Sequence, residues 1–397
     1  MSTRKTRIGI IGAGPAGLML SHLLHLSGID NVVLEARPRE YVENRIRAGI
    51  LEYEVAQLLR ETGLGARMDA EGARHDGTNF LVDGVLHHID FQALVGKHVM
   101  LWSQHEVVRD LIAARLAAGG EIVFEAGDVA VHDYEAGSPL ITYTKDGVEC
   151  RLHCEIIAGC DGFHGICRQA FPSGMIVEYD RVYPFGWLGI LAEAAPSADE
   201  LIYANHKDGF ALLSMRSPSI SRLYLQCAPD EALAAWPDER VWEELARRLG
   251  HEGFSLNTGR IFQKSVTAMR SYVAEPMQLG RLFLAGDAAH IVPPTGAKGL
   301  NSAIADVVSL HRAIDAYMRH QDDRGLNEYT QRCLKRIWQI ERFSWWMTSM
   351  MHKFDHHAPF DARMQTAELN YILTSPAGQM TLAENYVGLP LHEYHRS

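Results

Sequence analysis

The sequence predicts a protein of mixed α/β and α+β class. A discontinuous, Rossmann-like dinucleotide-binding domain carries an inserted domain of mainly antiparallel β-sheet and ends in a helical C-terminal region. Three observations support this prediction. A glycine-rich turn joins a strand to a helix near the N-terminus, strand-like runs dominate the middle of the chain, and long helical patterns follow residue 285.

The first segment has the pattern of a βαβ unit. Residues 6–11 and 31–35 are short β-branched runs, and residues 15–27 between them have the apolar spacing of a helix. Such a unit places the end of its first strand beside the start of its helix. A ligand-binding turn is therefore expected near residues 12–17.

Glycines mark that turn as a dinucleotide site. The motif Gly12-x-Gly14-x-x-Gly17 permits a tight turn and lets a pyrophosphate approach the helix N-terminus. Glu35 ends the second strand about 20 residues later, where an acidic side chain can bind ribose hydroxyls. The pattern predicts dinucleotide binding by these four residues, and glycine-mediated helix packing is the alternative.

The rest of the chain divides by the kind of element that it predicts. Residues 1–180 form the first part of the dinucleotide-binding domain, and residues 181–270 form the inserted sheet domain, which is expected to bind the substrate. Residues 271–397 return to the first domain and end in a helical region that is also a candidate dimerisation region. The predicted helices are residues 107–118, 241–249, 300–317, 327–351 and 359–371, and the predicted strands are residues 121–131, 140–143, 154–158, 185–192, 210–214, 222–227 and 281–285.

Charge and composition exclude several classes of protein. The 397 residues are 47% apolar and carry a formal net charge of -11, which argues against nucleic acid or an anionic membrane as a partner. The basic residues before the apolar stretch 8–20 resemble a signal peptide. However, glycines interrupt the stretch, no cleavage site follows, and no apolar run is long enough to span a bilayer. We therefore expect a cytoplasmic protein.

Cysteine and histidine usage predicts no metal site. The six cysteines lack CxxC pairs and the density of a disulfide scaffold, so we expect buried, reduced thiols. The 20 histidines are scattered, without an HExxH motif or a similar arrangement of ligands.

A second ligand-binding segment follows the strand at 281–285. It contains Gly286-Asp287 and the glycine-rich stretch 293–299, just before the helix that is predicted to begin at Leu300. A carboxylate and main-chain N–H groups beside a helix start can contact a ribityl chain or a phosphate. These residues alone leave the choice between NAD and FAD open.

Three motifs in this order, the N-terminal glycine motif, Asp161-Gly162 and Gly286-Asp287, make the chain similar to the single-component flavoprotein aromatic hydroxylases. The resemblance implies FAD as cofactor, with the glycine motif and Glu35 on its ADP half and Asp287 on its ribityl chain. It also implies NADPH or NADH as co-substrate, without a Rossmann domain of its own. Asp161 is expected to support both FAD and the nicotinamide cofactor.

Longer blocks resemble the members of this family that act on 4-hydroxybenzoate. The resemblance runs essentially from end to end. It implies that the chain adds a second hydroxyl to this acid, through O2 and a C4a-hydroperoxyflavin, to give 3,4-dihydroxybenzoate. The blocks are residues 45–49, 159–165, 181–187, 201–205 and 384–390.

The inserted sheet contains a candidate site for the substrate carboxylate. Ser214 and Arg216 are two residues apart, so on one strand they point to the same face, and Tyr224 follows on the next predicted strand. Arg216 can pair with a carboxylate in a bidentate manner while Ser214 donates beside it. The resemblance assigns all three residues to substrate binding, and a solvated arginine at a sheet edge is the alternative.

Hydroxylation next to a phenol is favoured when the phenol is ionised, so the site needs a route for its proton. The resemblance implies that Tyr203 contacts the phenol, that Tyr386 follows it, and that the relay continues through water to His75. Histidine titrates near neutral pH and suits a proton exit. Pro294 is expected to line the flavin and the substrate. The alternative for each tyrosine is a core residue with a bonded hydroxyl.

The resemblance also implies further cofactor contacts. The flavin is expected to move between an outer position, where it meets the nicotinamide, and a dry inner position, and glycines beside Pro294 suit that movement. Gln104 and Arg47 are expected at the FAD phosphates, Gly299 and Asn301 beside the flavin, and Arg45, His164 and Arg270 at NAD(P)H.

The segment 36–43 departs from the family pattern that favours NADPH. Relatives specific for NADPH carry an arginine where this chain has Ala36. Arg37 and Arg39 can still pair with a 2′-phosphate, whereas Glu40 and Glu43 repel it. We therefore expect the protein to use both NADPH and NADH.

The helical tail contains an aromatic and methionine-rich cluster, residues 341–351, which core packing and a family-type homodimer interface both explain. Two alternatives for the activity stay open. One is the same chemistry on 3-hydroxybenzoate or 3,4-dihydroxybenzoate, with Leu212 setting the tolerance. The other is a regulatory protein that binds FAD without catalysis, although the chain keeps all five predicted substrate and relay residues on the sheet and the tail: Tyr203, Ser214, Arg216, Tyr224 and Tyr386.

Overall fold

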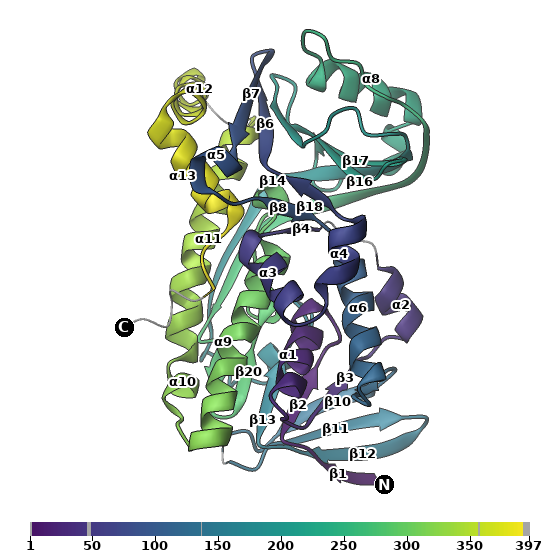
Figure 1. Ribbon diagram of the computed structural model, residues 1–397, viewed down its shortest axis with the longest axis vertical. Coiled ribbons are helices and arrows are strands. Elements are labelled where there is room, and N and C mark those ends of the chain that lie inside the picture. The colour runs from purple at the N-terminus through teal and green to yellow at the C-terminus, as the bar shows by residue number, and fades with distance from the viewer. Residues whose placement is uncertain (1, 46–48, 136, 356–357, 392–397) are drawn as a thin grey trace.

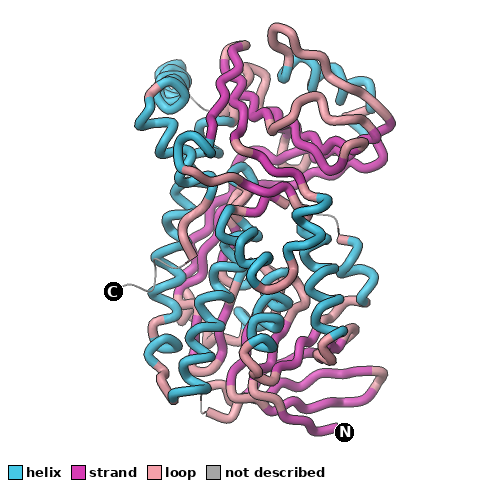
Figure 2. Tube along the Cα trace, viewed as in Figure 1, coloured by secondary structure: helices cyan, strands magenta, loops and turns pink. Residues whose placement is uncertain are grey.

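The computed structural model describes residues 2–45, 49–135, 137–355 and 358–391. A parallel sheet forms the core of the lower part of the molecule, and a large, mainly antiparallel sheet forms the upper part (Figure 1). Long C-terminal helices stand along one side of both parts (Figure 2). The predicted fold class, a Rossmann-like domain with an additional sheet and a helical C-terminal region, is confirmed.

The lower part is built on a six-stranded sheet with the order β19-β20-β13-β2-β3-β9, parallel from β20 to β9. Every residue of β2 is buried, as expected for a central parallel strand that is covered on both faces. Helices cover one face, and Ile141 and Leu152 of a second, four-stranded sheet pack with β2 in the same core. Strand β20 follows the inserted segment in the chain, so the domain is discontinuous. The strands are β2 (Ile8–Ile11), β3 (Asn31–Leu34), β9 (Glu121–Val123), β13 (Ile156–Gly159), β19 (Gln278–Leu279) and β20 (Leu282–Leu284).

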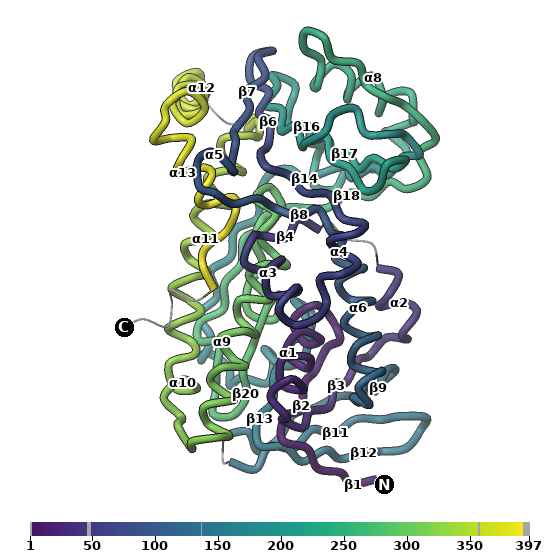
Figure 3. Tube along the Cα trace, in the orientation of Figure 1, coloured from purple at the N-terminus to yellow at the C-terminus, as the bar shows by residue number. Residues whose placement is uncertain are grey.

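Helix α1 (Pro15–Leu26) begins directly after the first strand of this sheet. It packs against α6 (Gln104–Ala117) and α9 (Gly299–His320), which come from distant parts of the chain (Figure 3). Its side chains Leu18, Met19 and Leu20 are fully buried, which explains why the helix lacks a polar face of normal width. The start of α1 is thereby fixed relative to α9.

The upper part is built on an eight-stranded sheet with the order β21-β18-β14-β17-β16-β15-β6-β7. The hairpin of β6 and β7 comes from residues 77–90, and β6 pairs in parallel with β15. The sheet is therefore wider than the predicted substrate segment 181–270, and the domain bounds at 180 and 270 stay a prediction. The strands are β6 (Gly77–Val82), β7 (Val85–Asp90), β14 (Val177–Glu193), β15 (Ile202–Asn205), β16 (Ala211–Ser217), β17 (Ile220–Cys227), β18 (Arg260–Glu275) and β21 (His290–Ile291).

The two faces of the upper sheet bury different side chains. Ile202, Leu213 and Leu223 pack on one face with α8 (Asp238–Leu249). Tyr203 and Tyr224 pack on the other face, with side chains of the C-terminal helices. Because strand residues alternate between faces, Leu212 and Ser214 of β16 belong to this second face. The pairing of β16 with β17 shifts register between Met215 and Ser217, so the place of Arg216 follows from its contact with Ser103 instead.

The helical C-terminal region consists of α11 (Tyr329–Met351), α12 (Pro359–Thr374) and α13 (Pro376–Val387) beside α9. In the cluster at 341–351, Phe343, Met347 and Met351 are buried, whereas Trp345 is 43% exposed. Core packing accounts for the buried side chains, and the homodimer interface stays a prediction for the exposed one. Among the residues that the structure describes, no helix is long and apolar enough to cross a membrane.

One predicted strand, residues 121–131, is two strands, because the chain turns at Glu125 with a positive φ of 59°. The remaining strands form two smaller sheets, with the orders β1-β12-β11-β10 and β4-β8-β5, and the other remaining elements are short helices. The remaining elements are β1 (Ser2–Lys5), α2 (Arg39–Asn44), β4 (Ile50–Leu51), α3 (Tyr53–Glu61), α4 (Gly65–Glu71), β5 (Ala73–His75), α5 (Phe91–Val95), β8 (Val99–Leu101), β10 (Gly127–His132), β11 (Leu140–Lys145), β12 (Val148–His153), α7 (Ile166–Gln169), η1 (Leu233–Ala235), η2 (Gly286–Ala288), η3 (Pro294–Gly296) and α10 (Arg324–Asn327).

Candidate active site

The N-terminal glycine turn has the geometry of a pyrophosphate site. Gly12 has a φ of +105°, and a Cβ there would clash with the Cys160 carbonyl oxygen, while a Cβ on Gly17 would clash with Gly12. By contrast, a Cβ on Gly14 would meet no described atom within 4 Å. Space is therefore left above the start of α1, which has no side-chain cap among the described residues and can offer its N–H groups to an anion.

Glu35 lies at the end of β3 and faces the same turn. Its Oε2 accepts a hydrogen bond from the Ala13 N–H at 2.8 Å, and its Oε1 accepts one from the Arg37 N–H at 2.8 Å. The carboxylate is thereby held beside the glycine turn. Each oxygen retains a second lone pair, which a ribose hydroxyl can use.

Asp161 lies in the loop after β13, next to Gly12. Its Oδ2 accepts a hydrogen bond from the Cys167 N–H at 2.9 Å, and its Oδ1 is buried without a hydrogen-bond partner among the described residues. Burial raises the pKa of Asp161, and the bond from Cys167 opposes part of that rise. A buried oxygen of this kind calls for a donor, which a bound ligand would supply.

Packing brings the Gly286-Asp287 motif to the same place. Gly286 has a φ of +62°, and a Cβ there would lie 3.0 Å from the Cβ of Ala303 in α9 and 3.5 Å from that of Ala16 in α1. The exposed Asp287 therefore lies close to the start of α1. Three predicted motifs that are far apart in the sequence meet at one edge of the parallel sheet.

The turn after β21 carries Pro294, which is exposed. Asn301, in the first turn of α9, connects this turn to residues 50–52 by hydrogen bonds. Both amide hydrogens of Asn301 are donated to main-chain carbonyls, of Ile50 and Ala297, at 2.9 Å. Its Oδ1 accepts the Glu52 N–H at 2.9 Å. The predicted cofactor contact of Asn301 must therefore come from its main chain or its remaining lone pair. Gly299 is only partly buried beside this turn.

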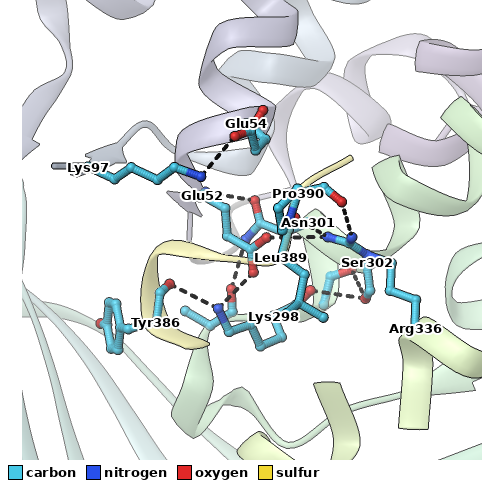
Figure 4. A network of polar contacts seen from close by, with 12 residues as sticks. Glu52, Glu54, Lys97, Lys298, Asn301, Ser302, Arg336, Tyr386, Leu389 and Pro390 are labelled. Carbon is cyan, nitrogen blue, oxygen red and sulfur yellow. Dashed lines mark hydrogen bonds and ion pairs between the residues drawn. The ribbon is translucent and has the colours of Figure 1, made fainter. Parts of the chain in front are cut away.

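A buried ion pair that the sequence did not indicate lies next to this turn (Figure 4). Lys298 donates to Glu52 Oε1 at 2.7 Å and to the Tyr386 carbonyl oxygen at 2.9 Å, and Arg336 lies 3.8 Å from Glu52 Oε2. Burial lowers the pKa of Lys298, and the Glu52 carboxylate opposes this. The pair ties the predicted flavin turn to the segment that carries Tyr386, which explains how residues 384–390 come to the site.

Two of the predicted substrate-binding residues, Tyr203 and Tyr224, form one row across the upper sheet with Leu212. Tyr203 in β15 lies directly opposite Leu212 in β16, and Leu212 lies opposite Tyr224 in β17. Ser214 follows Leu212 by two residues and shares its face by strand alternation. The row therefore gathers side chains from three neighbouring strands, and Leu212 lies at its centre.

Arg216 lies two residues beyond Ser214, where the pairing of β16 with β17 shifts register. Its Nη1 donates to Ser103 Oγ at 2.9 Å, and Ser103 immediately precedes Gln104 at the start of α6. Burial, followed by the charge of Arg222, lowers the pKa of Arg216 to about 10. The cation is held in a poorly solvated place, where an anionic ligand would stabilise it. Arg216, which is predicted to bind the substrate carboxylate, is thus bonded to the residue next to Gln104, which is predicted to contact the FAD phosphates.

The hydroxyls of Tyr203 and Tyr386 are hydrogen-bonded at 2.7 Å, and both side chains are almost completely buried. Burial, followed by Tyr386, raises the pKa of Tyr203 well above its ordinary value. Burial also raises the pKa of Tyr386, to about 12, although the hydroxyls of Tyr203 and Thr78 oppose the rise. Neither phenol is ionised near neutral pH, so the pair is suited to passing a proton on.

His75 lies at the end of β5, three residues before Thr78, and is 1% exposed. Both of its ring nitrogens are buried without a hydrogen-bond partner among the described residues. Burial lowers the pKa of His75, and the carboxylates of Glu200 and Asp76 oppose this. Thr78, which hydrogen-bonds the Tyr386 side chain, follows His75 by three residues, so His75 is close along the chain to the end of the tyrosine pair.

The residues predicted to bind the nicotinamide cofactor are only partly brought together. Arg270 lies over the Phe163 ring at 4.8 Å, and the exposed His164 packs edge-on against the same ring at 5.0 Å. Arg270 also forms a bidentate ion pair with Asp180. Arg45 is exposed after α2, and Arg47 lies outside the described residues.

These features define the class of the protein as a flavin-type dinucleotide-binding protein. The open space at Gly14 fits the pyrophosphate of FAD. The buried Asp161 oxygen, which has no partner among the described residues, fits a hydrogen-bond donor of the cofactor, and the exposed Asp287 carboxylate fits the ribityl hydroxyls. The aromatic row with its buried cation lies on the neighbouring sheet. Site and fold together therefore suit an oxidoreductase that acts on a small aromatic ligand.

Comparison with known proteins agrees with this class. A family model described as an FAD binding domain matches residues 5–344. A protein named p-hydroxybenzoate hydroxylase from Acinetobacter baylyi is 47% identical over 392 residues, which are 98% of this chain and 97% of that protein. A probable NADH-specific resorcinol 4-hydroxylase from Rhodococcus jostii is 24% identical over 81% of this chain and 61% of its own. The crystal structure of p-nitrophenol 4-monooxygenase from Pseudomonas putida shares the fold, with a TM-score of 0.79, 18% identity and coverage of 96% of this chain and 97% of that one.

The chain belongs to the FAD-binding family of single-component aromatic hydroxylases. The predicted family and the predicted cofactor, FAD, are confirmed. The residues at the FAD, substrate and relay positions stay predictions, which the geometry above supports to different degrees.

Proposed function

We propose that the chain hydroxylates 4-hydroxybenzoate to 3,4-dihydroxybenzoate with FAD, O2 and a reduced nicotinamide cofactor. The observation that carries this proposal is the 2.7 Å bond between the Tyr203 and Tyr386 hydroxyls, on the sheet face that also carries Tyr224, which lies near Arg216. A proton relay and a poorly solvated cation beside one row of side chains suit an acid with its phenol and carboxylate at opposite ends of a ring. The 47% identity to a named p-hydroxybenzoate hydroxylase supports the same substrate.

At the carboxylate end, Arg216 is expected to form a bidentate ion pair, with Ser214 and Tyr224 donating hydroxyl hydrogens beside it. The lowered pKa of Arg216 supports this role, because a buried cation gains most from an anionic partner. Ser103 holds one guanidinium nitrogen at 2.9 Å, which limits the orientations available to the side chain. The ring of the substrate would then extend along the row toward Tyr203.

At the phenol end, the substrate hydroxyl is expected to donate to Tyr203, whose own hydrogen passes to Tyr386. Because the pKa values of both tyrosines are raised, neither stores the negative charge, and the proton moves on toward Thr78 and, through water, His75. The phenolate left on the substrate donates electron density to the neighbouring ring carbon. FAD, when bound, supplies the activated oxygen that this carbon attacks.

The cofactor would be held by the residues that meet at the edge of the parallel sheet. We infer that the turn with Gly12, Gly14 and Gly17 takes the pyrophosphate, that Glu35 takes a ribose, and that Asp287 takes the ribityl chain. Pro294 is exposed on a turn that Lys298 joins to Tyr386, so a flavin ring above this turn would lie near the relay. Gln104 is next to Ser103 and would link both ligands.

The enzyme is expected to use NADPH and NADH with catalytic efficiencies that differ by less than about tenfold. Arg39 of α2 pairs with Glu43 at 2.7 Å, and Arg37, which precedes α2, lies 5.5 Å above the Tyr41 ring, so each arginine would have to share or leave its present contact to bind a 2′-phosphate. Exposed ion pairs contribute about 0.2–1 kcal/mol, so each such contact shifts the preference by less than about sixfold. Initial-rate kinetics with each coenzyme measure the ratio. A preference of about a hundredfold for either one would overturn this expectation.

The proposed activity is tested by following NADPH and NADH oxidation by the purified FAD-loaded protein, with and without 4-hydroxybenzoate, while 3,4-dihydroxybenzoate is quantified by chromatography. Oxidation that the acid stimulates, with an equal amount of product, is the expected result. Rapid oxidation that yields only hydrogen peroxide would instead mean that another phenolic acid is the substrate. Parallel assays with 3-hydroxybenzoate and 3,4-dihydroxybenzoate then identify it.

We also propose that the chain forms a homodimer through α11 and α12. Phe360 is 73% exposed, Met364 54% and Tyr371 55%, and Trp345 is exposed on the adjacent helix. Exposed aromatic and methionine side chains at this density are typical of protein interfaces. Sedimentation is expected to give twice the chain mass at micromolar concentration, and Phe360→Asp should shift the population toward monomer. A monomer in the unmodified protein would contradict the proposal.

We also propose that the protein is cytoplasmic. All six cysteines are buried and form no disulfide. Reduced, buried thiols are typical of proteins in a reducing compartment. Fractionation of cells that produce the full chain would test this expectation.

A further inference from the structure

Asp306, on the buried face of α9, contacts the motif that carries Asp287. Its Oδ2 accepts a hydrogen bond from the Gly286 N–H at 3.0 Å and is bonded to His290 Nε2 at 2.6 Å. The side chains of His290 and Asp306 are 2% and 4% exposed. One carboxylate oxygen thus holds both ends of the short segment from Gly286 to His290.

The same segment packs between α1 and α9. Ala303 lies one turn before Asp306 on α9, and it faces Gly286 at the distance of a close contact. Ala16 of α1 approaches Gly286 from the other side. Any change in the position of Asp306 would therefore move the Gly286 main chain and, with it, the exposed carboxylate of Asp287.

The charges around His290 favour a strong bond to Asp306. Burial by itself lowers the pKa of His290, but the Asp306 carboxylate, followed by Asp287 and Glu341, more than offsets this, so the pKa is raised. A protonated imidazole donates a charge-assisted hydrogen bond, which is about twice as strong as a neutral one. His290 is also paired with Val273 of β18, so the bond anchors the segment to the upper sheet.

We propose that Asp306, together with His290, is a positioning residue for FAD. The pair fixes the Gly286-Asp287 turn so that the Asp287 carboxylate faces the ribityl hydroxyls. FAD binding follows from the family, but the proposal rests on the proposed contact of Asp287 with the cofactor. Asp306 itself is buried and acts through the turn.

A double-mutant cycle on FAD affinity tests this proposal. The apoprotein is titrated with FAD, and the dissociation constant is measured by the quenching of flavin fluorescence. Asp306→Asn keeps the size of the side chain but removes the charge. It is expected to raise the dissociation constant by about 10- to 100-fold, the range for losing a hydrogen bond to a charged group. In an Asp287→Asn background the same change should have less than about a threefold effect, because residues that act through one another are not additive.

A matched control distinguishes this effect from a general loss of helix stability. Asp315 lies on the same helix and pairs with Arg319 at the surface, so Asp315→Asn should leave the FAD dissociation constant unchanged. If Asp306→Asn does not fold, His290→Gln carries the same test, because it removes the imidazole that bonds Asp306.

The possible results distinguish the positioning role of Asp306 from the cofactor contact of Asp287. Equal effects of Asp306→Asn with and without Asp287→Asn would mean a purely structural role and would overturn the proposal. An unchanged dissociation constant in Asp287→Asn alone would refute the ribityl contact on which the proposal rests. Neither result would bear on whether the enzyme hydroxylates 4-hydroxybenzoate, which product analysis decides separately.

Discussion

Replacement of Arg216 by alanine is expected to weaken the binding of 4-hydroxybenzoate by about 30- to 1000-fold, which corresponds to about 2–4 kcal/mol. The guanidinium is held in a poorly solvated place, where its pKa falls to about 10 because of burial and the charge of Arg222. A substrate carboxylate would offset that cost, so its loss removes a charge-assisted, bidentate interaction. Titration of the FAD-loaded enzyme with the acid, followed by flavin absorbance, measures the change.

Two further variants make this test specific. Arg216→Lys keeps the charge but loses the planar fork, so it should recover only part of the affinity. Arg260→Ala removes an exposed arginine of the same sheet, which pairs with Glu193, and should leave binding unchanged. The neutral amide of the substrate adds a second control, because its affinity should be nearly the same in the native enzyme and in Arg216→Ala. Native-like affinity of Arg216→Ala for 4-hydroxybenzoate would remove Arg216 from the carboxylate site.

Replacement of Tyr203 by phenylalanine is expected to leave substrate binding within about threefold and to reduce hydroxylation by at least about a hundredfold, since a positioned proton acceptor contributes about 10²–10⁴ in rate. The ring of Tyr203 stacks on Phe80 at 5.5 Å, and phenylalanine keeps this contact. Only the hydroxyl that bonds Tyr386 at 2.7 Å is lost. The amount of 3,4-dihydroxybenzoate formed per coenzyme oxidised is the measurement.

Control variants show whether the relay is responsible. Tyr386→Phe should lower the same ratio, because it removes the second hydroxyl. Tyr183→Phe alters an equally buried tyrosine whose hydroxyl bonds Ser271 instead, and it should behave like the native enzyme. If Tyr203→Phe abolished binding as well as product, its role would be structural. If product formation were unchanged, the proton would have to leave by another route.

Local sequence patterns were sufficient for the parts of the molecule that depend on backbone conformation. The turn at Gly12 needs a positive φ and the absence of a Cβ, and both requirements are visible in the residue type. Continuous apolar runs likewise identified β2, β3, β13 and β20, because strands in a covered parallel sheet are buried on both faces. The family resemblance added the order of the motifs and, through it, the cofactor.

The hairpin of β6 and β7 shows where those patterns fail. Its residues were not predicted as strands, and β6 joins the upper sheet by pairing with β15, more than a hundred residues away in the chain. Pairing of this kind depends on which edge strand of the folded sheet is free, and the local periodicity of apolar residues does not predict it. The width of the substrate sheet was therefore underestimated.

The sequence by itself determined the fold class, the glycine turn and, through the resemblance, the family, because these depend on residue type and local spacing. The substrate and relay residues stay predictions. Only the tertiary structure decided how they are supported. Lys298 carries no pattern in the sequence that marks it as buried, and it is buried beside Glu52, 246 positions away. Asp306 likewise reaches the Gly286 N–H and His290 only in the folded chain. A buried charge is stable only beside a partner, and folding alone brings that partner within reach.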